Sequence, residues 1–155
     1  MSAYTIFDIA NWFLQRRELD QKATQKLCYY AQAWGLAMTD RRIMDEVFEA
    51  WAHGPVNRKL WKRLTDYGMN YILKNEFDGI ANPVEDEDTL YVLNEVDRVY
   101  GDWDGLELEM KTHSEAPWIK ARERGGVSTT GLEPSQEIIL DKDMIDYYRP
   151  RLQAV

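Results

Sequence analysis

The sequence predicts a mainly α fold: a single compact helical domain of about six helices with at most a small β-hairpin. Its 155 residues fit one domain, since single cores of roughly 100 to 200 residues are the usual unit. Hydrophobic residues make up 45% of the chain and aromatic residues 12%, which is enough apolar surface for a core of this size. Apolar residues recur at helical spacing along most of the chain. We therefore treat residues 1–155 as one domain.

The first part of the chain predicts two helices. Thr5 and Asp8 form a variant capping box, and apolar residues follow at helical spacing, which predicts a helix over 6–17. Thr24 stands at the N-cap position of a second helix, whose apolar residues make it the most buried of the predicted helices. Gly35 lies inside this helix and costs it about 1 kcal/mol against alanine, so we expect another backbone to approach closely there.

The motif EAWAHGPV, residues 49–56, is predicted to start a third helix. Proline fixes φ and lacks an N–H, which is harmless in the first turn of a helix, and Gly54 accepts the angles of the entry turn. Helical spacing continues after Pro55 and stops at Gly68. The segment 40–51 leaves a small hairpin and irregular structure as alternatives.

The second half predicts shorter helices. Asp86 is placed to cap a helix that ends at Gly101, and a further helix is predicted over 106–113. Pro117 suits the first turn of the next short helix.

The last segment of the chain predicts a linker and one more helix. Residues near 125–135 are rich in Gly, Ser and Thr, and we expect a mobile linker there. The final helix has Asp141 as its predicted cap and Pro150 as its stop.

Charge is distributed unevenly along the chain. Nineteen Lys and Arg against 27 Asp and Glu give a net charge of −8, which disfavours nucleic-acid binding by this chain alone. Residues 75–110 hold twelve acidic residues and one base, a balance of −11, so 18 bases and 15 acids, or +3, remain elsewhere. Either this region is a solvated face, or it steers a basic partner. The candidate steering residues are Glu85, Asp86, Glu87, Asp88, Asp102 and Asp104.

The sequence offers few groups for catalysis or metal binding. His53 and His113 are its two imidazoles, and neither stands in a catalytic or metal-binding motif. A metal site built from both histidines and Cys28 would lack the short paired spacings of zinc sites. Cys28 has apolar neighbours, which predicts a buried thiol. We therefore predict no enzyme, no cofactor and no metal, with His53 in a structural position beside the amides at the start of the third helix.

The sequence predicts a cytoplasmic protein. A single cysteine forms no internal disulfide, as is usual in a reducing compartment. The N-terminus lacks a basic segment before its apolar residues, and no stretch approaches the ~20 apolar residues that span a bilayer. We expect neither secretion nor membrane insertion.

Three segments, taken in order, carry a resemblance to a known family. They are KLCYYAQAWGLA at 26–37, EAWAHGPV at 49–56 and THSEAPWIKAR at 112–122, followed by a short apolar helix. Together they resemble the Panacea or SocA-like antitoxin domain, which is also found in GepA-type phage-associated proteins. The resemblance extends over nearly the whole chain, 6–148.

The resemblance implies an antitoxin of a bacterial or phage toxin-antitoxin system. Such a protein neutralises a cognate protein toxin, for example a translation inhibitor, by direct protein contact. Some members act as adaptors that deliver the toxin to a ClpXP-type protease, which is the first alternative. A hydrolase or modifying enzyme that uses His53 or His113 is the second alternative. The resemblance assigns no catalytic residue.

The positions matched to the family are expected to form a scaffold that supports the toxin-facing surface. Each histidine stands in a matched segment beside a tryptophan or a Pro-Trp pair, so we predict that these two segments meet in the fold. The scaffold residues are Lys26, Leu27, Tyr29, Tyr30, Trp34, Ala50, Trp51, His53, Gly54, Pro55, Val56, Thr112, His113, Pro117 and Trp118.

Overall fold

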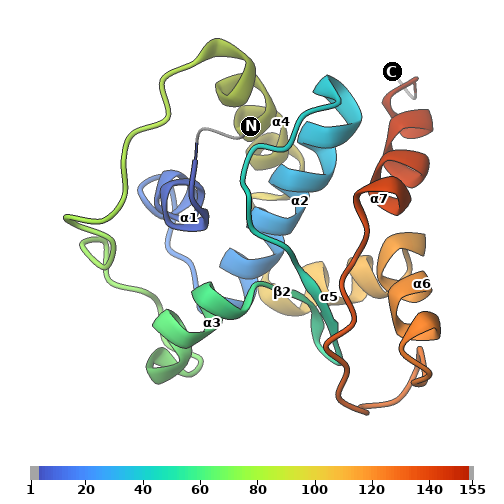
Figure 1. The fold of residues 1–155 in the computed structure, drawn as a ribbon. Coiled ribbons are helices and arrows are strands. Elements are labelled where there is room, and N and C mark those ends of the chain that lie inside the picture. Colours follow the sequence, from blue (N-terminus) through green and yellow to red (C-terminus); the bar gives the residue numbers. More distant parts are fainter. Residues whose placement is uncertain (1–3, 154–155) are drawn as a thin grey trace.

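A computed structural model describes residues 4–153, and helices make up more than half of the chain (Figure 1). The described part contains seven α-helices, two 3-10 helices and one hairpin, which confirms the mainly α prediction. None of these helices is both long enough and apolar enough to cross a membrane. The elements are α1 (Ile6–Leu14), α2 (Gln21–Thr39), β1 (Glu49–Trp51), β2 (Gly54–Val56), α3 (Arg58–Leu64), η1 (Thr65–Tyr67), α4 (Glu87–Tyr100), α5 (Gly105–His113), α6 (Ala116–Arg124), α7 (Asp141–Tyr148) and η2 (Arg149–Gln153).

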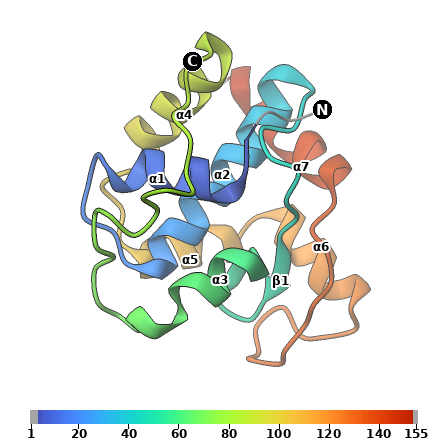
Figure 2. The same cartoon turned by 60° about the vertical axis from the view of Figure 1, so that its left-hand side comes forward.

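Helix α2 is the central element of the fold. It contacts α1, α3, α4, α5, α7 and strand β2, and two views of the ribbon show the other helices arranged around it (Figures 1 and 2). Two buried amides of α2 also hold loops in place. Gln25 exchanges two hydrogen bonds with the main chain of Asn57, and Gln32 bonds to the main chain of Ile43 and Met44. Polar side chains in this buried helix therefore fix the chain on either side of the hairpin.

Helix α1 begins as predicted and ends one turn earlier. The side chains of Thr5 and Asp8 form the reciprocal capping box. The helix ends at Leu14, and the carbonyls at and after its end are bonded to a side chain from another segment. Lys74 donates to the carbonyls of both Leu14 and Arg17.

Helix α2 starts earlier than Thr24 predicts. Asp20 is the N-cap, and its side chain accepts the Ala23 N–H at 2.9 Å. Thr24 lies in the first turn and donates its hydroxyl to the Asp20 carbonyl at 2.8 Å. The expectation of a backbone against Gly35 is wrong, because a side chain fills that place. A Cβ on Gly35 would lie 2.6 Å from Cδ1 of Ile43.

The motif 49–56 forms the hairpin instead of starting a helix. Pro55 pairs with Ala50 in the antiparallel register, and its strand is at the edge of the sheet, where a missing N–H is tolerated. On the other side of β1, the Ala50 N–H donates to the Glu137 carbonyl at 2.9 Å. Helix α3 begins after the hairpin with Asn57 as its N-cap. The prediction that Pro55 opens the third helix is therefore wrong.

The later helices follow the predictions closely. Asp86 caps α4, which is followed by Gly101, and Pro117 lies in the first turn of α6. Asp141 is the first residue of α7 and not its cap, so that assignment is wrong by one position. Pro150 lies in η2, just past the end of α7.

Residues 125–135 connect α6 to the C-terminal part of the chain. Arg122 of α6 is fully buried, and its guanidinium donates to the carbonyls of Ser128 at 2.8 Å and Ala50 at 3.1 Å. The first part of the connection is thus tied to the hairpin. Mobility of the connection stays a prediction.

Candidate functional site

The tip of the hairpin lies against side chains of α2 and α5. A two-residue turn, Ala52 and His53, is closed by Gly54, whose φ of 102° is in the region that favours glycine. A Cβ on Gly54 would lie 2.8 Å from Cε of Lys26 and 3.0 Å from the Thr112 hydroxyl. Both the backbone angle and the close approach of α2 and α5 therefore require glycine here.

The two segments that contain the histidines meet, as predicted. The Trp118 indole N–H donates to the Trp51 carbonyl at 2.9 Å. The His113 ring stacks on Trp118, with 4.1 Å between ring centroids and 17° between ring planes. The main chain of Ala52 also faces the His113 imidazole. These contacts fix α5 and α6 to the hairpin.

His53 lies on the outer side of the turn. Its side chain is 62% exposed, and its Nδ1 lies 3.3 Å from a carboxylate oxygen of Glu109. The expected position beside the first amides of the third helix is wrong, because that helix begins only at Arg58. Lys22 donates to the other oxygen of Glu109 at 2.6 Å. Burial opposes ionisation of Glu109, but the hydrogen bonds with Lys22 and His53 outweigh it and lower its pKa.

Lys26 places an amine in the interior beneath the hairpin tip. The residue is 1% exposed, and neither a hydrogen bond nor an ion pair within residues 4–153 engages its ammonium. Burial lowers the pKa of Lys26 to about 7, and the nearby Glu109 opposes this only in part. Sequence reasoning placed Lys26 in the scaffold without recognising that it is buried. The available signal was its position one helical turn before Tyr30, on the apolar side of α2.

His113 is a second basic group in the same interior. Its Nε2 is buried and has no hydrogen-bond partner in the described part of the chain. Burial lowers the pKa of His113, and the charge of Lys26 lowers it further. The visible role of His113 is to stack on Trp118.

An open groove of about 650 Å³ lies over Lys26. Trp51 and Trp61 form one wall, with 5.4 Å between their ring centroids. Met69 and Leu106, which are 94% and 59% exposed, lie along the groove as well. The first residues of α2 and α5 also border it. The exposed tryptophan, Met69 and Leu106 side chains give this groove apolar surface beside several polar groups, a combination that suits a ligand or a partner segment.

Other scaffold residues form a separate buried cluster on α2. Tyr30 and Tyr148 both donate to one oxygen of Glu115, at 2.7 and 2.8 Å, and the Tyr29 hydroxyl lies 3.1 Å from that of Tyr148. Burial raises the pKa of Glu115, while the two hydroxyls act in the opposite direction. This cluster joins α2, α6 and α7. Of the other scaffold residues, Leu27, Ala50, Pro55, Val56, Pro117 and Trp118 are buried, and Trp34 is half-buried.

Comparison with known proteins places the chain in a family. The sequence model described as "Antitoxin SocA-like, Panacea domain" matches residues 24–119, more than half of the chain. The chain belongs to this family. The match contains every scaffold residue but is narrower than the predicted 6–148, because α1 and α7 lie outside it. No match was found among curated proteins or among solved structures.

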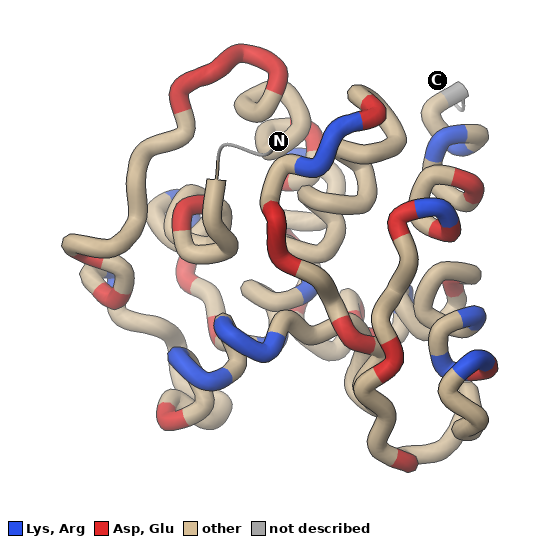
Figure 3. The backbone as a smooth tube through the Cα atoms, in the orientation of Figure 1, with Lys and Arg blue, Asp and Glu red and all other residues tan. Residues whose placement is uncertain are grey.

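The acidic candidates of this SocA-like chain fall into two groups, one at each end of α4. Residues 85–88 precede and begin α4 and form one acidic run (Figure 3), whereas Asp102 and Asp104 follow the C-terminal end of α4 in the sequence. Fourteen helical residues separate the groups by about 20 Å. They are therefore two surfaces and not one.

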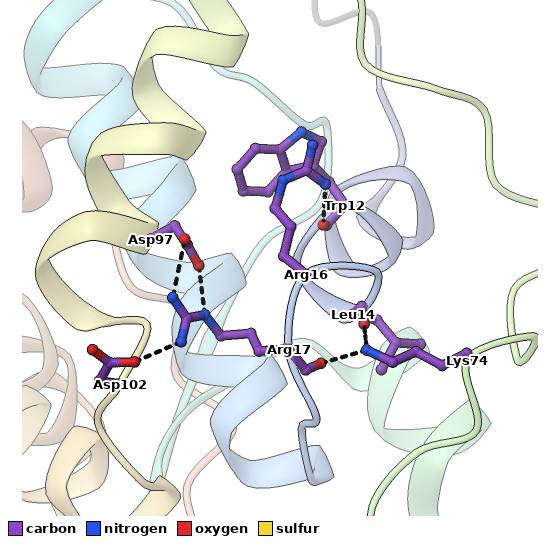
Figure 4. Close-up of polar contacts among 7 residues, drawn as sticks. All are labelled: Trp12, Leu14, Arg16, Arg17, Lys74, Asp97 and Asp102. Atoms are coloured by element: carbon purple, nitrogen blue, oxygen red, sulfur yellow. Dashed lines mark hydrogen bonds and ion pairs between the residues drawn. The ribbon is translucent and has the colours of Figure 1, made fainter.

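Most of these acids already have partners. Arg17 binds Asp97 with two hydrogen bonds and Asp102 with a third, at 2.7 Å (Figure 4). Asp86 and Asp104 are N-caps, and Asp88 lies 3.3 Å from Arg41. The side chains of Glu85 and Glu87 are exposed and engage no partner within residues 4–153.

The metal-ligating side chains of the described residues and the one thiol bear on whether the site could be a metal or catalytic centre. Among the described residues, no group of three or more His, Cys, Asp or Glu side chains is placed to hold a metal ion. Cys28 is buried, as predicted, and burial raises the pKa of its thiol, which suppresses the reactive thiolate. What the SocA-like chain presents here is an apolar groove above a buried amine.

Proposed function

We propose that this chain is an antitoxin that neutralises a cognate protein toxin, such as a translation inhibitor, by binding it directly. In this proposal the chain acts in the bacterial cytoplasm, as part of a toxin-antitoxin system. Membership of the SocA-like antitoxin family supports a protein partner. The groove beside the hairpin tip is the proposed centre of the binding surface.

The observation that carries the proposal is the groove itself. Trp61 is 36% exposed beside Trp51, and Met69 and Leu106 extend the apolar surface. Binding energy at protein interfaces concentrates in tryptophan, tyrosine and arginine side chains at the centre of the contact. The family-matched hairpin holds Trp51 at this place through the Trp118 hydrogen bond. In this proposal the scaffold presents aromatic side chains to the partner.

Binding accounts for the site better than catalysis does. His113 stacks in the interior, and His53 is an exposed partner of Glu109. An enzyme would need a nucleophile or an activated water beside such a pair. The one thiol, Cys28, is enclosed in the core.

The acidic run before α4 is proposed to steer a basic partner. Glu85 and Glu87 are exposed there and have no side-chain partner within the described residues, whereas Asp102 is paired with Arg17. Like charges gathered at one place accelerate encounter with an oppositely charged surface. The steering role therefore falls mainly on Glu85 and Glu87.

A titration in cell-free translation tests the proposed function. Purified chain is added in steps to a fixed amount of the protein encoded beside it, and protein synthesis is measured. Direct binding predicts recovery that is complete at a fixed molar ratio of the two proteins. Complete recovery at a small fraction of the toxin concentration would contradict binding and favour an enzyme.

The same assay separates binding from delivery to a protease. A reconstituted translation mixture contains no ClpXP-type protease, so an adaptor would restore no synthesis until that protease is added. Direct binding predicts the same recovery with and without the protease.

A further inference from the structure

Lys26 carries a buried amine that has no hydrogen-bond or ion-pair partner within residues 4–153. Removing an ammonium from water costs several kcal/mol, and proteins offset this cost with a carboxylate or with several acceptors. Arg122, which is fully buried as well, has carbonyl partners from two segments. Lys26 has none within residues 4–153, although its side chain lines the groove.

The carboxylates nearest to Lys26 are hydrogen-bonded to other groups. Glu109 is held by Lys22 and His53, and Asp20 caps α2. Neither lies within ion-pair distance of the Lys26 ammonium. The first turns of α2 and α5 border the same groove, and helix N-termini add positive potential there. The Lys26 amine thus brings positive charge to the floor of the groove, and the two aspartates of the lining, Asp20 and Asp104, serve as helix N-caps.

We propose that the groove binds a glutamate side chain of the partner protein, with its carboxylate on the Lys26 ammonium. Apolar residues beside that glutamate pack on Trp51 and Trp61. The inference rests on the proposed function, because it names the chemistry by which the toxin would be recognised. In this proposal the ligand supplies the carboxylate partner that the buried Lys26 ammonium lacks.

A side chain fits this floor better than a chain terminus does. A partner backbone brought down to Lys26 would carry N–H and C=O groups that need their own partners. The apolar side chains of the lining offer no such partners, and the Gln25 amide is already bonded to the main chain of Asn57. A glutamate side chain brings a carboxylate on an apolar stem and nothing else to satisfy. The rim carries Asp20 and Asp104, so the residues beside the glutamate are apolar or basic.

Two blocked tripeptides test the inference without the toxin. Acetyl-Leu-Glu-Leu-amide and acetyl-Leu-Gln-Leu-amide are titrated into the ¹⁵N-labelled full chain, and the indole N–H signals of Trp51 and Trp61 are followed by NMR. We expect the glutamate peptide to shift these signals and to bind at least tenfold more tightly than the glutamine peptide. Equal binding of the two peptides, or binding of neither, would overturn the inference.

Two further probes identify other occupants. N-acetyl-leucine carries a carboxylate at a chain terminus, and acetate carries a carboxylate alone. Stronger binding of N-acetyl-leucine than of the glutamate peptide would replace the side chain with a C-terminus and overturn the proposal as stated. Acetate that shifts the signals as strongly as the glutamate peptide would also overturn it, because the tryptophans would then add nothing.

A lysine variant and a matched control locate the effect. Lys26→Met keeps the length of the side chain and removes the charge, and it is expected to abolish the preference for glutamate over glutamine. Lys62→Met removes an exposed charge from α3, outside the groove lining, and is expected to leave the preference unchanged. An unchanged preference in a folded Lys26→Met chain would contradict the assignment.

A pH series needs no variant. Because burial brings the pKa of Lys26 to about 7, the fraction that carries a proton falls above neutrality. Affinity for the glutamate peptide is expected to fall about tenfold from pH 7 to pH 8.5, while affinity for the glutamine peptide stays constant. The groups that face Lys26 are Asp20 and Lys22 on α2, Glu109 and His113 on α5, and the His53 turn. A parallel change for both peptides would point to one of these groups and overturn the assignment to Lys26.

The cell-free titration keeps this inference separate from the proposed function. Stoichiometric neutralisation with no glutamate preference at the groove would remove the inference and leave the antitoxin function standing. A glutamate preference without neutralisation would remove the antitoxin function and leave the ligand chemistry of the groove standing.

Discussion

Two regions beside helix α2 each contain one buried charged group, Glu115 at the start of α6 and Lys26 on α2 itself, and the surroundings of the two groups differ. Glu115, 3% exposed, reaches α2 through the Tyr30 hydroxyl, accepts a second hydroxyl from Tyr148, and has Lys111 at 3.9 Å. Lys26, 1% exposed, receives no partner within residues 4–153. One region is complete in the free chain, and the other is not.

The difference separates stability from function. A buried charge with good hydrogen bonds costs much to disrupt, whereas a buried charge without partners lowers the stability of the fold that contains it. The Glu115 cluster closes α2 against α6 and α7, away from the groove. Lys26 lies under a groove whose lining combines exposed tryptophan with an amine that has no partner among the described residues. We therefore assign scaffolding to the first region and recognition to the second.

The largest effect is expected from Glu115→Ala. The change leaves the hydroxyls of Tyr30 and Tyr148 without their acceptor and opens space in the core. The free energy of unfolding should fall by about 3 kcal/mol. Urea unfolding followed by circular dichroism measures it, with Glu123→Ala, an exposed change on the same helix, as the control. A loss below about 1 kcal/mol would mean that the cluster is not a scaffold.

Lys26→Met is expected to act in the opposite direction. Replacing an unpaired buried cation with an apolar side chain of similar length should raise the free energy of unfolding by about 2 kcal/mol at pH 7. The same variant should neutralise the toxin less well. Lys62→Met, which changes an exposed residue, should stay within about 0.5 kcal/mol of the native chain. A less stable Lys26→Met chain with unchanged neutralisation would reverse the comparison.

Trp61→Ala tests the groove wall. The side chain is partly exposed, so its removal should change the free energy of unfolding by less than about 1 kcal/mol. Its loss from the centre of an interface should weaken toxin binding by about 2 kcal/mol, or roughly thirtyfold. Calorimetry of the complex measures the affinity. Binding of native strength would place the toxin on another surface.

The smallest effect concerns steering. The double change Glu85→Gln and Glu87→Gln should slow association with a basic toxin by about threefold at low salt and leave dissociation unchanged. Stopped-flow measurements at two salt concentrations give both rates. A second pair, Glu18→Gln and Glu123→Gln, removes the same charge from other exposed positions. Equal slowing by both pairs would show that net charge, and not the run before α4, sets the rate.

The sequence alone predicted those helices whose start is marked by residues a few positions apart. The Thr5 capping box, the Asp86 cap and the proline in the first turn of α6 each depend on residues a few positions apart, and each is where the pattern predicted. A small hairpin was allowed by the sequence, but its position at 49–56 was missed for a physical reason. Pro55 suits a helix start and an edge strand equally, and the choice depends on a strand partner, Ala50, and on the Glu137 carbonyl far along the chain.

In the candidate site, too, some features could be predicted from the sequence and others depend on long-range contacts. Pairing of the two histidine segments was predicted because both carry family motifs, and the Trp118 bond to Trp51 confirms it. The burial of Lys26 depends on Gly54 and Thr112, which the fold brings over it from two other elements. Spacing along α2 places Lys26 on the apolar side of the helix, but it does not say whether a carboxylate will meet the ammonium. That absence is a property of the tertiary structure.

The central claim is that Lys26 is buried without a partner, and the pH dependence of unfolding tests it most directly. Between pH 7 and about pH 10 the unfolded lysine keeps its proton, while the folded lysine, with a pKa of about 7, loses it. The unfolded state therefore binds more protons, and the stability of the native chain rises with pH in this window. Titrations common to both chains cancel when native and Lys26→Met proteins are compared.

We predict that Lys26→Met is the more stable chain at pH 7 and that its advantage shrinks with pH, by up to ~1.4 kcal/mol per unit, from pH 7.5 to pH 9.5. Urea unfolding of both chains across this range gives the difference. A native chain that is the more stable of the two at pH 7, or a difference that does not change with pH, would contradict the account.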